Sequence, residues 1–92
     1  MLLFHFLRAA AHLLAEGGRL YMVARPAMLP DIMMGCGTWG LGPLQLQPVG
    51  PPEGPAVHTL VTCRKGAAPG LEILPQRTVE EILGGNPGVL PR

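Results

Sequence analysis

The sequence predicts a small α/β fold in which helices flank a sheet with one buried strand. Three observations lead to this prediction. Residues 2–16 repeat apolar side chains at helical spacing, residues 19–24 contain a continuous apolar run, and residues 43–64 hold two segments that alternate between apolar and polar. Helical spacing of apolar residues is typical of an amphipathic helix. An unbroken apolar run is typical of a strand covered on both faces, and alternation of apolar and polar residues is typical of a half-exposed strand.

The composition narrows the possible functions. The chain has 92 residues and a formal net charge of +1, which fits one small domain or part of a larger one. Apolar residues make up 48% and charged residues 14%, which argues against general disorder despite 13 glycines and 11 prolines. The absence of serine and the single aspartate exclude Ser-based triads and paired-Asp sites. With 7 basic and 6 acidic side chains, the chain lacks the charge of a stand-alone nucleic-acid binder.

Targeting and metal-binding signals are weak. The apolar stretch 1–7 has no positive charge before it, and polar residues interrupt it within two helical turns, so it predicts neither a signal peptide nor a membrane span. Cys36 and Cys63 are too few for a disulfide framework or a zinc site and are interpreted as small buried thiols in a reduced, cytoplasmic chain. His5 and His12 lie seven residues apart without a third ligand, so no metal site is expected.

The first helix is expected over residues 2–16, because its apolar and polar side chains fall on opposite faces. The apolar face carries Leu3, Leu7, Ala10 and Leu14, and the polar face carries His5, Arg8, His12 and Glu16. Gly17 and Gly18 supply its C-terminal cap. The polar face has too little positive charge to favour binding to an anionic membrane surface.

The apolar run 19–24 predicts a strand buried on both faces, which ends at Arg25-Pro26. Residues 27–34 predict a short helix with Pro30 in its first turn. A helix, a turn and a buried strand form the second half of a βαβ unit, which implies an earlier strand. The chain begins at the helix, so we interpret the sequence as the rear portion of a larger sheet.

The rear of the sequence predicts an antiparallel hairpin. Residues 44–47 and 56–64 alternate as half-exposed strands do, and a proline-rich loop over 48–55 joins them. Residues 71–74 predict a last short strand, and Thr78-Val-Glu-Glu81 is a capping box that opens one or two helical turns. The tail after Gly84-Gly85 is expected to fray, and Asn86-Pro87-Gly88 to form a turn.

Gly35, Gly37 and Gly40 match the spacing of a cofactor-binding G-x-G-x-x-G loop. Such a loop needs a strand before it and a long helix after it. Pro30 leaves little room for a strand, and the prolines from Pro43 onward prevent a long helix. The segment is therefore interpreted mainly as the end of the preceding helix, with a cofactor loop as the alternative.

The order of these elements resembles the C-terminal half of class I S-adenosylmethionine-dependent methyltransferases, and most of all the bacterial small-domain group that resembles valine-tRNA adenine methyltransferases. The resemblance covers roughly residues 5–75. It rests on Ala10-Ala11-His12-Leu13-Leu14, Gly18-Arg19-Leu20-Tyr21-Met22-Val23, Arg25-Pro26, Gly40-Leu41, Leu46-Gln-Pro-Val49, Pro55-Ala56-Val57-His58-Thr59-Leu60-Val61, Arg64-Lys65-Gly66 and Pro69-Gly70-Leu71.

The resemblance implies an incomplete Rossmann-like methyltransferase sheet: a helix, a buried strand, a short helix and a C-terminal antiparallel hairpin over residues 43–64. Residues 1–75 would be the rear half of that domain, and residues 76–92 a short helix and tail. In the family, the cofactor loop, the ribose-binding acidic residue and the Asn-Pro-Pro-Tyr motif for the target amine lie in the front half. No residue here matches them, so no catalytic or cofactor-binding residue is assigned, and the family's cofactor, S-adenosylmethionine, is not expected to bind this chain alone.

The resemblance therefore implies a fragment of a methyltransferase of the tRNA adenine amine type that contributes scaffold and is inactive alone. The alternative is a non-catalytic assembly module that pairs through an open sheet edge, either with a second copy or with a front-half methyltransferase segment. In relatives, the stretch equivalent to residues 42–52 is rich in basic residues, whereas here it is not. The loss of positive charge weakens RNA binding, so the RNA recognition of the family is not expected for this chain. The cations considered for RNA contact are Arg25, Arg64, Lys65 and Arg77, for which ordinary surface charge is the favoured interpretation.

Overall fold

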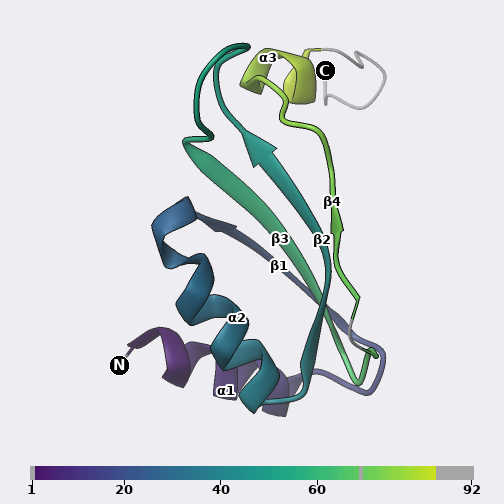
Figure 1. Cartoon of the computed structure of the whole chain (residues 1–92). Helices are drawn as coiled ribbons and strands as arrows, with labels where there is room; N and C mark the ends of the chain where they lie inside the picture. Colours follow the sequence, from purple (N-terminus) through teal and green to yellow (C-terminus); the bar gives the residue numbers. More distant parts are fainter. Residues whose placement is uncertain (1, 69, 85–92) are drawn as a thin grey trace.

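The computed structural model describes residues 2–68 and 70–84, and four strands in this part form one mixed sheet. The strands are β1 (Arg19–Ala24), β2 (Leu41–Val49), β3 (His58–Lys65) and β4 (Glu72–Ile73), arranged in the order β1-β3-β2-β4. The β3 strand runs antiparallel to β1 and to β2, and β4 runs parallel to β2 (Figure 1). The predicted α/β class, the strand at 19–24 and the antiparallel hairpin are thus confirmed.

The two long helices lie on the same face of this sheet. The α1 helix (Leu2–Leu13) precedes β1, and α2 (Leu29–Thr38) connects β1 to β2 after one 3₁₀ turn, η1 (Pro26–Met28) (Figure 1). The amphipathic pattern of the first helix is confirmed, because Leu7 is buried and His5, Arg8 and His12 are exposed. The helix ends at Leu13, three residues earlier than expected, and Gly17 adopts a positive φ of 83° in the turn to β1.

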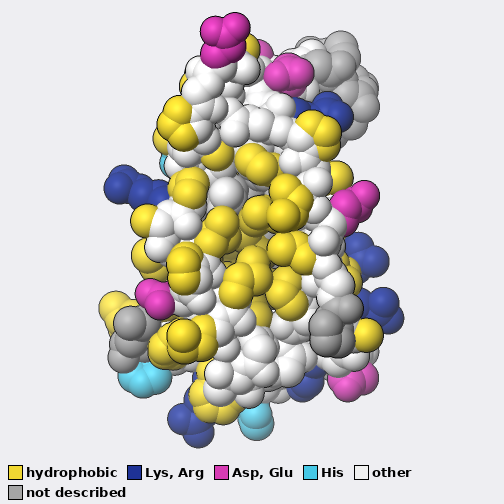
Figure 2. Space-filling view, in the orientation of Figure 1, with side chains coloured by type: hydrophobic (Ala, Val, Ile, Leu, Met, Phe, Trp, Pro, Cys, Tyr) yellow, Lys and Arg dark blue, Asp and Glu magenta, His cyan; other side chains and the backbone are white. Residues whose placement is uncertain are grey.

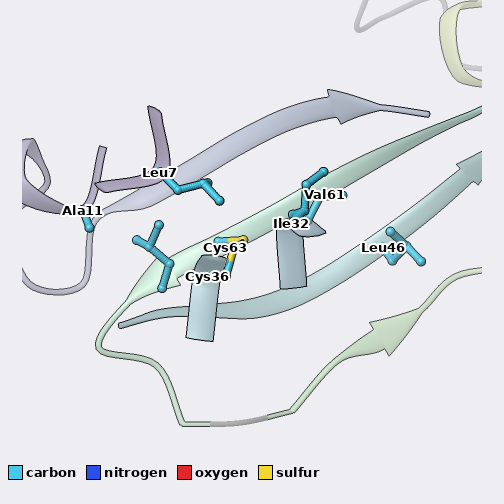
Figure 3. Close-up of a cluster of buried hydrophobic side chains, with 8 residues drawn as sticks. Leu7, Ala11, Ile32, Cys36, Leu46, Val61 and Cys63 are labelled. Carbon is cyan, nitrogen blue, oxygen red and sulfur yellow. Dashed lines mark hydrogen bonds between the residues drawn. The ribbon is translucent and has the colours of Figure 1, made fainter. Parts of the chain in front are cut away.

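The core is a single layer between these helices and one face of the sheet. Its buried members come from both helices and from β2 and β3: Leu7, Ala11, Ile32, Cys36, Leu41, Leu46, Val61 and Cys63 (Figure 3). In β3, Thr59, Val61 and Cys63 are buried, whereas the residues between them are only half-buried. Within the described residues, helices cover one face of the sheet and no element covers the other.

This arrangement corrects the prediction that β1 is buried on both faces. Along β1, exposed and half-buried residues alternate, and Tyr21 and Val23 are 68% and 70% exposed. Leu20, Met22 and Ala24 pack against the core from the other face. The apolar run 19–24 does not distinguish a strand covered on both faces from one covered on a single face. Both faces of such a strand are apolar in either case.

The second helix is longer than the predicted 27–34. Pro30 lies in its first turn, as expected, but α2 continues through Gly35 and Gly37 to Thr38. Glycine disfavours helix interiors, so tertiary packing sustains this part of the helix. Gly35 is buried where α1 crosses α2, and a Cβ added there would overlap Leu7 and lie 3.0 Å from Phe4 Cδ1.

The first hairpin strand is longer than predicted, whereas the second, predicted over 56–64, is β3 at His58–Lys65. The β2 strand includes Pro43 and Pro48, outside the expected 44–47, and its register against β3 shifts between Pro43 and Gln45. This bulge accommodates one extra residue in β2 beside the proline, which cannot donate a ladder hydrogen bond. The predicted last strand is present as β4, which pairs with β2 at Gln45 and Leu46.

The capping box predicted at residues 78–81 is confirmed at the start of α3 (Val79–Leu83). The Glu81 amide donates to the Thr78 side chain at 3.0 Å, and the Thr78 amide donates to the Glu81 carboxylate at 2.9 Å. The hydrogen bond from the Thr78 amide lowers the pKa of Glu81. The Gln76 side chain donates to the carbonyls of Pro51 and Gly54, which ties this segment to the hairpin loop. The predicted frayed tail and the turn at 86–88 lie outside the described residues.

Two glycines of α2 offer a matched test of the close helix packing. Gly35→Ala is expected to lower the free energy of unfolding by up to about 2 kcal/mol, because overpacking costs about 1–3 kcal/mol and the gain in helix propensity offsets only about 1 kcal/mol. Gly37→Ala meets no atom within 4 Å and is expected to raise stability by about 0.5 kcal/mol. Urea titration followed by circular dichroism measures both. Equal effects of the two substitutions would contradict the crossing of α1 over Gly35.

Candidate interaction surfaces

The uncovered face of the sheet carries a shallow apolar hollow. Its volume is about 350 Å³, and side chains from all four strands or their ends surround it. The lining includes Tyr21, Val23, Gln47, Leu60, Thr62 and Leu74. Cross-strand register places Tyr21 opposite Thr62 and Val23 opposite Leu60, so these side chains share one face. A sheet face of this apolar character is usually covered by another layer.

The outer edge of β1 is a second surface of this kind. In the described part of the chain, β1 pairs with β3 on one side and with no strand on the other. Beside this edge is a hollow of about 450 Å³, which α1 and η1 line with Leu3, Phe6 and Met28. Phe6 is 52% exposed and Met28 41% exposed. An unpaired edge flanked by exposed apolar side chains is a template for pairing with another chain.

The structure does not bring the four cations considered for RNA contact together. Arg64 and Lys65 end β3 at the start of β1, whereas Arg25 follows the other end of β1. Arg77 forms a bridge with Val49, beyond β2 and on the opposite side of the sheet from β1. The Lys65 ammonium donates to the Leu14 carbonyl at 2.9 Å, and thus satisfies a carbonyl at the end of α1. Of these four cations, Lys65 alone lies with other basic side chains around a hollow, the third one described below.

The glycines of the G-x-G-x-x-G match lie at the end of a helix. Gly35 and Gly37 belong to α2, and Gly40 makes the turn into β2 with a φ of 73°. A cofactor loop of this type lies between a strand and the N-terminus of a helix. Here the glycines lie between the C-terminus of a helix and a strand.

Two thiols meet inside the core. The sulfurs of Cys36 in α2 and Cys63 in β3 are 3.4 Å apart, and both residues are fully buried (Figure 3). A hydrogen bond from Cys63 lowers the pKa of Cys36, and the same contact together with burial raises the pKa of Cys63. Both thiols are free, as expected, but the sequence did not predict their contact.

A third hollow, of about 600 Å³, lies where α1, the end of α2 and the end of β3 meet. Four basic side chains and one indole line it: His5, Arg8, His12, Lys65 and Trp39. The Arg8 guanidinium lies over the Trp39 ring, 5.6 Å from its centroid. Sequence reasoning assigned the three α1 residues to a solvated face and did not single out Trp39. One available signal was the i, i+3, i+7 spacing of the basic residues, which places them on one helix face.

Two further findings apply to the described residues 2–68 and 70–84. They contain no cluster of three His, Cys, Asp or Glu side chains that could hold a metal ion. They also contain no helix that is both long and apolar enough to span a bilayer.

Comparison with known proteins finds a similar fold among the solved structures. No family model matches the sequence, and no curated protein matches it. Among solved structures, the chain is similar to the crystal structure of a predicted O-methyltransferase from Agrobacterium tumefaciens, with a TM-score of 0.75 and 29% sequence identity. The match covers 85% of this chain and 37% of that protein. The chain therefore has a methyltransferase-like α/β fold and corresponds to little more than a third of the matched protein.

The buried thiols predict slow chemical modification in the folded state. Cys36 and Cys63 are each 0% exposed, so alkylation by iodoacetamide should require unfolding, because only an accessible thiolate reacts. Mass spectrometry of the native chain is expected to show neither site labelled while both react in guanidinium. Cys36→Ala and Cys63→Ala provide single-thiol controls, and rapid labelling of either native thiol would contradict the packing described here.

Proposed function

We propose that this chain is the scaffold-forming rear part of an S-adenosylmethionine-dependent methyltransferase domain, of the type that methylates an adenine amine in tRNA. The observation that carries the proposal is the match of helix, strand, helix and antiparallel hairpin to a methyltransferase structure over 85% of the chain. The residue-level resemblance over residues 5–75 supports the tRNA adenine type. The matched protein is described as an O-methyltransferase, so the choice of acceptor depends on the sequence resemblance.

In this proposal, the described residues support the catalytic half without contacting the cofactor. The cofactor's sulfonium supplies the methyl group in such enzymes. The glycines whose spacing fits a cofactor loop are placed at a helix end, so we derive no cofactor contact from them. The chain would contribute β1 as a sheet strand, α1 and α2 as the cover of one face, and β2 and β3 as the closing hairpin.

Exchanging segments between proteins tests this role. The 92-residue chain would replace the matching segment in two hosts, the Agrobacterium protein and a bacterial valine-tRNA adenine methyltransferase. The tRNA-methylating chimera is expected to bind S-adenosylmethionine with an affinity within about tenfold of its parent. This range corresponds to a loss of less than about 1.4 kcal/mol in binding free energy, as expected when the scaffold is preserved. It should also still form methyladenosine in tRNA. Calorimetry and nucleoside mass spectrometry measure the two outcomes.

Both parents serve as positive controls, and the isolated chain as the negative control. Folded chimeras that bind no cofactor would contradict the scaffold role. A chimera active only in the Agrobacterium host would keep the scaffold role and contradict the tRNA adenine type.

The second candidate function is a non-catalytic assembly module that pairs through the outer edge of β1. The exposure of Tyr21 and Val23 beside that edge favours it, because apolar residues on an unpaired strand promote edge-to-edge association. Pairing with a second copy or with a separate front-half segment would satisfy the same edge.

A charge placed on the β1 edge tests this second function. If β1 edges pair, Val23→Lys should shift the chain to monomers in sedimentation velocity, because a lysine on an edge strand disfavours edge-to-edge pairing. Val57→Lys is the matched control, since Val57 is 55% exposed in the hairpin loop, beyond the end of β1, and its substitution should leave association unchanged. A wild-type chain that stays monomeric up to millimolar concentration would argue against self-pairing.

A further inference from the structure

The hollow beside Trp39 concentrates positive charge in a chain that is nearly neutral as a whole. The formal net charge is +1, yet Arg8, Lys65 and two histidines line this one hollow. Figure 2 shows histidine and basic side chains at the lower end of the molecule, where α1 lies in Figure 1, with an acidic side chain at the right of the same end. Among residues 2–68 and 70–84, no carboxylate lines the hollow, although Glu16 lies nearby over Gly66. Anions are therefore the ligands that this surface attracts.

The arrangement of donors suits a phosphate group. His5, Arg8 and His12 lie on one face of α1, and Lys65 faces them from the end of β3. Arg8 carries five N–H donors in a planar fork that matches phosphate oxygens. Its position over Trp39 orients that fork before a ligand arrives. Lys65 uses one of its three donors on the Leu14 carbonyl, which fixes the ammonium and leaves two donors.

The indole adds a feature that a simple anion site does not need. Trp39 is 37% exposed, so part of the indole remains open to solvent although the Arg8 guanidinium lies over its ring. Aromatic side chains next to basic ones bind the bases of nucleotides by stacking while the cations hold the phosphate. The volume of about 600 Å³ lies within the range of about 300–1,000 Å³ typical of small-ligand sites.

We propose that this hollow binds a nucleotide unit, with its phosphate at Arg8 and Lys65 and its base against Trp39. The hollow lies where β1 begins and β3 ends, whereas ligands of open α/β sheets usually bind beyond the carboxyl ends of parallel strands. It is therefore separate from the place where a methyltransferase-like sheet would hold its cofactor. The nucleotide unit has two sources, a free mononucleotide or a single-stranded RNA.

Trp39 is the only tryptophan of the chain and reports directly on binding. The probes are adenosine monophosphate, adenosine, inorganic pyrophosphate and a six-nucleotide oligoadenylate, in low-salt buffer. Adenosine monophosphate is expected to quench the Trp39 fluorescence saturably. Adenosine should bind at least tenfold more weakly because it lacks the charged group, and pyrophosphate should bind without comparable quenching because it lacks a base.

Three variants separate the contributions, with calorimetry as the readout that does not depend on the indole. Arg8→Gln is expected to weaken binding of adenosine monophosphate about tenfold or more, the loss of one charge-assisted hydrogen bond. Trp39→Leu should weaken binding of adenosine monophosphate about fivefold or more and leave the affinity for pyrophosphate unchanged. Arg77→Gln, which removes a cation at a distant bridge, should change neither affinity by more than about twofold.

The oligonucleotide shows whether the bound nucleotide unit comes from single-stranded RNA or from a free mononucleotide. Oligoadenylate binding at least tenfold tighter than adenosine monophosphate indicates single-stranded RNA, and equal affinity indicates a mononucleotide. Pyrophosphate binding as tightly as the nucleotide would overturn the assignment, because the base would then contribute nothing. Failure of every probe to bind up to 5 mM, about 3 kcal/mol of binding free energy, would overturn it as well. So would binding that survives unchanged in folded Arg8→Gln and Trp39→Leu variants.

Discussion

The fold depends on the close packing of two helices on one face of a four-stranded sheet. The helices meet where Gly35 leaves room for Leu7, and this crossing brings Ile32 and Cys36 onto Val61 and Cys63. A chain of this size buries only about 60–65% of its unfolded surface, so a single apolar layer must supply most of the stability. One larger side chain at the crossing therefore affects the whole core.

The same one-sided packing leaves apolar side chains in contact with water. Tyr21 and Val23 project from the uncovered face, and Phe6 and Met28 lie beside the free edge of β1. Apolar side chains also remain visible in the middle of the face on which α2 lies (Figure 2). Covering such surfaces gains about 25 cal/mol per Å². A missing layer of the same domain and a separate partner would both provide that gain, which is why the scaffold role and the pairing role share one physical basis.

Local signals predicted the elements that local chemistry determines. The bounds of β1 follow from Gly17-Gly18 before it and Arg25-Pro26 after it, and the capping box follows from two side chains three residues apart. Features that depend on distant neighbours were missed. An apolar run does not reveal whether a second layer covers it, so the exposure of Tyr21 was not predicted. The predicted helix ended at residue 34, whereas packing against Leu7 carries α2 to Thr38. The basic hollow joins residues from three elements, which no single segment of sequence shows.

Amide hydrogen exchange tests most directly whether β1 is an open edge. At low micromolar concentration, alternate amides of β1 should exchange at rates close to those of unprotected peptides, because only every second one faces β3. Every interior amide of β3, which has a partner strand on each side, should be protected. Uniform protection of β1 equal to that of β3 would show that another strand covers this edge and would contradict the one-sided, open-edged sheet described here.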